Sequence, residues 1–154
     1  MTPRAGTVLG IFALTLLILQ ALVLASWIAG FALMLPSWAS STALIVGCRD
    51  VPAARPRAAS LGHLVCGATG VAVFVLAGPA AHPWAPWLAA PAVAVGVTLM
   101  WLVHCYHPPA AANAAIPLFT AATMPVYAGA VALGAALLLI AAHALDRADG
   151  RAAA

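Results

Sequence analysis

Two long apolar runs of the chain are joined by the stretch His104-Cys105-Tyr106-His107-Pro108-Pro109-Ala110. Proline has no backbone N–H and does not continue a helix, so the pair Pro108-Pro109 predicts a break in the backbone. Polar side chains beside a broken helix, at the end of a segment long enough to cross a membrane, are typical of an intramembrane site. The stretch therefore predicts an interrupted membrane protein rather than a set of plain spans.

The composition supports this class of protein. Of the 154 residues, 66% are hydrophobic and 6% are charged, and the mean hydropathy is +1.09. A soluble domain carries about 25% charged residues. We therefore expect one integral membrane domain, residues 1–154, embedded in a lipid bilayer with about four to six segments. The net charge of +3 is too small and too scattered to predict binding to nucleic acid.

Prolines and polar residues divide the chain into long and short apolar segments. The first run is too long for the apolar core of a signal peptide, about 7–15 residues, so we expect a retained helix. The expected fold class is an all-α polytopic bundle with four long spans and two short or broken helices. In chain order these are Thr7 to Ala29, the short Trp38 to Gly47, Ser60 to Ala77, Trp87 to Tyr106, the short Ala110 to Phe119, and Ala122 to Leu145.

The order long-short-long, long-short-long allows an inverted repeat, with the helices Ser37–Gly47 and Pro109–Phe119 related by a pseudo-twofold axis in the membrane plane. Arginines cluster at the N-terminus, in the loop 48–60 and at the C-terminus, while the loop 78–86 has none. The positive-inside rule then predicts that both termini, including a short tail from about Asp146, are cytoplasmic.

The starts of the two short helices are the expected ligand site. A helix N-terminus offers up to four free N–H groups and about half a positive charge. If both N-termini meet near the middle of the membrane, they form a site for a small anion without a buried formal charge. The alternative is that the hydroxyl groups bond back to their own helix. The candidate donors are Ser37, Ser40, Ser41 and Thr42 at the first helix, and His107 and Asn113 at the second.

Two histidines and one arginine complete the expected site. A polar ring in an apolar segment usually has a partner, so we predict that His63 and His107 approach one polar cavity beside the Ser40–Thr42 turn. Each could donate to the anion or carry a proton, or could instead cap a carbonyl. Arg57 could attract anions at the cytoplasmic mouth, or could set topology and pair with Asp50.

Metal binding and catalysis are not expected. His104, Cys105 and His107 are metal-ligand types, but Pro108 ends their helix and no further ligands stand nearby, so we predict no metal and no cofactor. The chain has no paired carboxylates, no nucleophile beside a base and no phosphate-binding glycine loop, so we expect no enzyme. The cysteines Cys48, Cys66 and Cys105 are expected to be free buried thiols.

Several of these residues resemble the HPP family of small integral membrane proteins. The run Ser37 to His63 is similar to the first signature of that family, and the second signature resembles His107-Pro108-Pro109-Ala110. The likeness covers about residues 10–145. The matching features of the first run are its Ser-aromatic-small-small-Ser start, Pro52, Pro56-Arg57 and Gly62-His63; Pro125 and Gly129 fit the last span. The chain departs from the family at Arg55 and Ala58, and at Ala111-Ala112-Asn113.

The resemblance implies a function. The family is bacterial and plastidic, and its plant members are associated with nitrite transport across the chloroplast envelope. The resemblance implies a multi-pass protein of the bacterial inner membrane that transports a small inorganic anion. Nitrite is the first candidate for that anion. Small residues suited to helix packing favour a homo-oligomer. The alternatives are an accessory subunit of a larger membrane complex, which could handle metal, and a fragment of a fusion protein.

Overall fold

Helices and 3-10 turns make up the computed structural model, which describes residues 5–28, 35–78, 84–120 and 123–150. No strand occurs in these ranges, so the prediction of an all-α protein is confirmed. The elements are α1 (Ala5–Ile28), α2 (Leu35–Gly47), the 3-10 turn η2 (Pro52–Ala54), α3 (Pro56–Ala77), α4 (Ala85–Leu102), the 3-10 segments η4 (Pro108–Ala114) and η5 (Ile116–Phe119), and α5 (Met124–Ala148).

Three of the helices are long and apolar enough to cross a membrane. These are α3, α4 and α5, with 22, 18 and 25 residues. The stretch of α1 from Leu9 to Leu24 is apolar but shorter. The multi-pass membrane class is therefore established by three candidate spans and one shorter apolar helix, rather than by the four long spans expected.

Proline sets where several helices begin. Each of α3, α4 and α5 has a proline in its first two positions, where the missing N–H is harmless and the fixed φ suits the helix. For this reason α3 begins at Pro56 and not at the predicted Ser60. The predicted span boundaries at Ala29 and Ala122 lie outside the described residues.

The end of α4 is earlier than predicted. The helix stops at Leu102 rather than Tyr106, because His104 has a left-handed φ of 55° and the N–H of Cys105 donates to the carbonyl of Met100 over 2.9 Å. Such a bond back across a left-handed residue is a common helix terminus. The chain is thereby turned toward the molecule before it reaches His107.

The second short segment is not the predicted α-helix. It forms two 3-10 pieces, η4 and η5, of seven and four residues. Three prolines in this stretch, Pro108, Pro109 and Pro117, each remove a backbone donor, and 3-10 pieces are short by nature. Of the two short segments, only α2, with 13 residues, therefore presents an α-helix N-terminus with an appreciable dipole.

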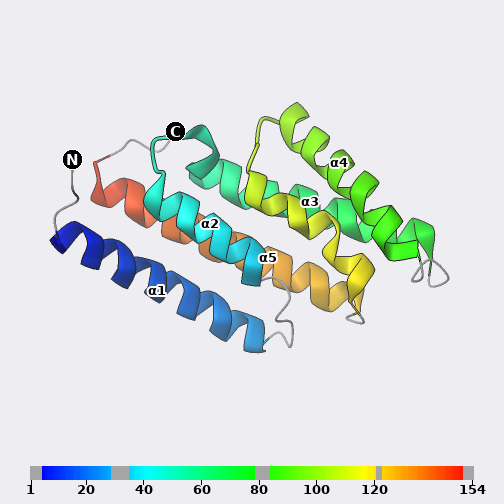
Figure 1. Cartoon of the computed structure of the whole chain (residues 1–154), viewed down its shortest axis with the longest axis horizontal. Coiled ribbons are helices and arrows are strands. Elements are labelled where there is room, and N and C mark those ends of the chain that lie inside the picture. Colours follow the sequence, from blue (N-terminus) through cyan, green and yellow to red (C-terminus); the bar gives the residue numbers. More distant parts are fainter. Residues whose placement is uncertain (1–4, 29–34, 79–83, 121–122, 151–154) are drawn as a thin grey trace.

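Successive segments run in alternating directions along the bundle (Figure 1). The start of α1, the end of α5 and the loop before α3 lie at one end, called here the arginine-loop end. At that end Arg49 pairs with Asp146 at 3.3 Å and with Asp149 at 3.2 Å. Helix α5 extends to Ala148, past the predicted start of the polar tail at Asp146. The ion pairs connect this end of α5 to the loop before α3.

Helix α3 is the centre of the packing and contacts α4, α5 and η4. One apolar cluster, around Trp38 and Tyr127, joins α1 and α2 to α5. A second, around Cys66 and Met100, joins α3 to α4 and η4. Cys66 and Cys105 are buried free thiols as predicted, whereas Cys48 is exposed, which corrects the prediction for that residue.

Candidate functional site

A single hydroxyl group joins two buried histidines. Ser41 lies on α2 and is fully buried. Its Oγ is 2.8 Å from Nε2 of His63 on α3 and 2.8 Å from Nε2 of His107, the residue before η4. Both rings are fully buried, with centroids 5.4 Å apart. Three segments distant in sequence thus meet at one side chain.

The hydrogen-bond partner of Nδ1 in each histidine shows which ring nitrogen carries the proton. His107 Nδ1 is 2.7 Å from the carbonyl of Ala53. A carbonyl only accepts, so His107 carries its proton on Nδ1. His63 Nδ1 is 2.8 Å from the amide nitrogen of Asn113, which donates to it, so the proton of a neutral His63 is on Nε2.

The hydrogen bonds of the network therefore run in one direction. Asn113 donates to His63, His63 Nε2 donates to Ser41, the Ser41 hydroxyl donates to His107 Nε2, and His107 Nδ1 donates to Ala53. The carbonyl of Ser37 lies 2.9 Å from the same Ser41 oxygen and is a second acceptor for its proton. We call Ser41, His63, His107 and Asn113 the histidine network.

Close backbone approach makes this network possible. A Cβ added at Gly62 would lie 2.8 Å from the Cβ of His107 and 3.2 Å from the carbonyl oxygen of Cys105. Glycine is therefore required next to His63, where α3 meets the chain leading into η4. On the other side, the hydroxyl of Tyr127 on α5 donates to the backbone carbonyl of Asn113.

The start of α2 meets the start of η4 directly. The hydroxyl of Ser37 donates to the carbonyl of Pro109 over 2.7 Å. Of the residues expected at the site, the structure thus brings together Ser37 and the four members of the histidine network.

Three expected site residues lie apart from the network. Ser40 is exposed and donates to Pro36 of its own helix, and Thr42 donates to Trp38 in the same way. Such bonds to the carbonyl four residues earlier are the usual alternative for hydroxyls in helices. Arg57 is exposed in the first turn of α3. Burial raises the pKa of the Cys105 thiol, and the charge of the nearby Arg57 guanidinium opposes that rise.

Two residues that contact the histidine network were not predicted from the sequence. Ala53 takes part through its backbone carbonyl, which no side-chain pattern reveals. Tyr127 could have been noticed as the one tyrosine in the last apolar run. Two buried side-chain atoms of the described residues have no hydrogen-bond partner, namely Nε1 of Trp38 and Oδ1 of Asn113.

The site is polar but holds no formal charge. The buried polar residues of the described ranges are serine, threonine, histidine and asparagine only. The network is also closed, because all four ring nitrogens of the two histidines have partners. The predicted approach of His63 and His107 to one polar cavity takes the form of hydrogen bonds between both rings and Ser41. In the described part of the chain, no group of three His, Cys, Asp or Glu residues is arranged to hold a metal ion.

Fold and site together define a helical integral membrane protein with an uncharged histidine network between its segments. The model of the HPP transmembrane region matches residues 2–153. The chain therefore belongs to the HPP transmembrane family, which confirms the resemblance seen in its motifs. No curated protein and no solved structure matches the chain.

Proposed function

We propose that the protein is a membrane transporter or channel for a small inorganic anion, with nitrite as the first candidate, and not an enzyme. The observation that carries the proposal is the Ser41 hydroxyl between two buried histidines. A buried, uncharged cluster of N–H and O–H donors can stabilise an anion without the cost of burying a permanent cation. The predicted set of anion-binding residues is thereby reduced to Ser37 and the histidine network.

The network can also accept one proton without losing a hydrogen bond. If His107 Nε2 took up a proton, it would donate to Ser41, whose own hydroxyl could turn to the Ser37 carbonyl at 2.9 Å. The cation so formed would attract an anion, which supports proton-coupled transport as well as passive flow. Acidification of the vesicle lumen along with anion uptake would separate the coupled mechanism from the passive one.

The proposal also includes the number of spans, the internal symmetry and the orientation in the membrane. We propose that α1 is a fourth span, that the two halves form an inverted repeat, and that the arginine-loop end is cytoplasmic in a bacterial inner membrane. The alternating directions of the segments support the repeat (Figure 1). The Arg49 ion pairs support a common side for the loop and the end of α5. We further propose a homo-oligomer, because exposed small residues allow close self-packing.

Flux into proteoliposomes tests the function. Nitrite, nitrate, formate and chloride are compared for the wild-type protein, His63→Ala, His107→Ala and His143→Ala. His143 is the control, because it lies on α5 and makes none of the network's hydrogen bonds. Loss of one buried donor costs about 1–3 kcal/mol, so we expect anion affinity to fall roughly 5–150-fold for the two network variants. Equal flux in all four proteins at matched insertion would contradict the proposal.

One observation favours a different function. Every ring nitrogen of the network is satisfied within the protein, as it would be in a purely structural core. The second candidate is therefore a non-transporting accessory subunit of a larger membrane complex. Wild-type protein that supports no anion flux, yet co-purifies stoichiometrically with other membrane proteins, would favour this alternative.

A further inference from the structure

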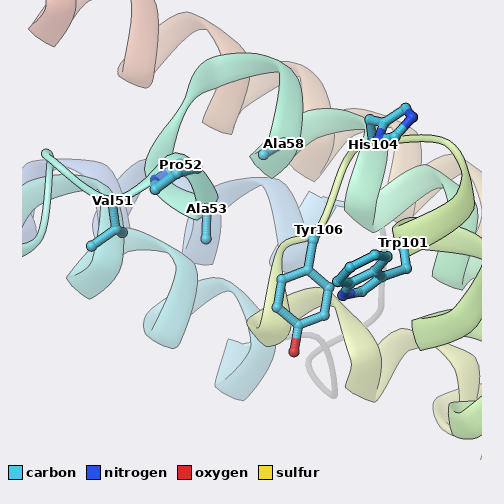
Figure 2. Close-up of a pocket in the computed structure, with 7 residues that line it drawn as sticks. All are labelled: Val51, Pro52, Ala53, Ala58, Trp101, His104 and Tyr106. Carbon is cyan, nitrogen blue, oxygen red and sulfur yellow. The ribbon is translucent and has the colours of Figure 1, made fainter.

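A pocket of about 410 Å³ is lined in part by the loop before α3, which belongs to the arginine-loop end. Figure 2 shows Val51 and Pro52 on one side of it and the aromatic rings of Trp101 and Tyr106 on the other. The pocket is lined by Val51, Pro52, Ala53, Ala58, Trp101, His104 and Tyr106. Neither histidine of the network lines it.

Ala53 connects the pocket to the network. It belongs to the pocket wall, and its carbonyl oxygen is the acceptor 2.7 Å from Nδ1 of His107. The Nδ1–H of His107 is therefore linked to the pocket wall by a single hydrogen bond to the Ala53 carbonyl. Ala53 lies in η2, a turn of only three residues between Val51 and Arg55, both in extended conformation. Two backbone hydrogen bonds close this turn, from Ala54 to Val51 at 3.0 Å and from Arg55 to Pro52 at 3.2 Å. A displacement of the turn would move the Ala53 carbonyl away from the Nδ1–H of His107.

The opposite wall is held in an unusual backbone conformation. His104 has a φ of 55°, and it is the one non-glycine residue of the described ranges with a positive φ. Glycine is the usual residue at such a helix end, because a side chain is disfavoured there. An imidazole is instead kept on the pocket wall, where strained backbone often marks a functional site.

We propose that this pocket is the access vestibule of the anion pathway, and that the anion leaves it by replacing the Ala53 carbonyl as the acceptor of the His107 Nδ1–H. The inference rests on the proposed transport function and adds its route and its gate. The charge of the region suits an anion, because Arg57 is exposed near Cys105 at the same end. The donor is passed from one acceptor to another, so it is not left unpaired at any stage.

Cysteine modification tests the route. In a Cys48→Ser background, which removes the exposed native thiol, Val51→Cys and Tyr106→Cys introduce thiols on opposite walls of the pocket. The control is Ala144→Cys, an exposed position on α5 that does not line the pocket. Each protein is treated with a methanethiosulfonate carrying either a sulfonate or a trimethylammonium group, and nitrite flux is measured before and after.

We expect the sulfonate to reduce flux by about tenfold or more at the pocket positions, the scale on which charge lining a cleft changes association rates. The trimethylammonium group should reduce it much less, and neither should affect the control. The flux of each protein after treatment is compared with its own flux before treatment. Because the two positions lie on different walls of the pocket, the test needs only one of the two cysteine variants to be active. If the wild-type protein conducts but both reagents act equally, or act no more than at Ala144→Cys, the vestibule is wrong while the function stands. If the wild-type protein shows no flux, the proposed function itself fails.

Discussion

Removal of the Ser41 hydroxyl tests whether the histidine network is an energetic unit. In Ser41→Ala, His63 Nε2 loses its acceptor and His107 Nε2 loses its donor, both in a fully buried position. Hydrogen bonds between membrane helices are worth on average about 0.6 and at most about 1.7 kcal/mol, so two lost bonds should lower the free energy of unfolding by about 1–3 kcal/mol. Only one oxygen atom is removed, so the loss of packing contributes little.

Ser40→Ala is the matched control on the same helix. Its hydroxyl is exposed and bonds only to Pro36 in the preceding turn, so we expect a change within about 0.5 kcal/mol. Both variants and the wild type are compared by reversible unfolding in detergent and lipid mixtures, with helicity as the signal. If the two serine variants are equally stable, the hydrogen bonds of the network contribute nothing measurable and the energetic reasoning is refuted.

Three shorter predictions follow from packing, charge and metal chemistry. A Cβ at Gly134 would overlap the ring of Trp38, so Gly134→Ala should destabilise the protein by about 1–3 kcal/mol; Gly129→Ala on the same helix, with open space around it, should be neutral or stabilising in the same unfolding assay. Arg49→Ala should cost about 1 kcal/mol because its ion pairs are only partly exposed, at 16% for the Arg49 side chain, 22% for Asp146 and 41% for Asp149, and the difference from wild type should shrink in high salt. Protein purified without added metal should contain no stoichiometric copper or zinc, and a bound metal lost in His107→Ala would show that the metal-handling alternative is right.

Much of the fold could be predicted because it depends on local properties of the chain. Membrane-length apolar runs bounded by proline and glycine identify helices without knowledge of their neighbours. The errors occur where tertiary contacts compete with local preference. The stretch from Ala110 to Phe119 was predicted as one helix, but its prolines and its packing against α3 leave two 3-10 pieces. The end of α4 was displaced by His104, whose φ of 55° is left-handed.

The candidate site divides in the same way. The sequence alone determined that Ser41, His63, His107 and Asn113 would need partners, because polar groups inside an apolar protein are costly when unpaired. Only the tertiary structure decided which partners they have. Ser41 is separated from His63 by 22 positions and from His107 by 66, and no local pattern encodes a hydrogen bond over such distances. The contact depends on the packing of α2, α3 and η4, and its outer partner, the carbonyl of Ala53, is a backbone group that every residue possesses.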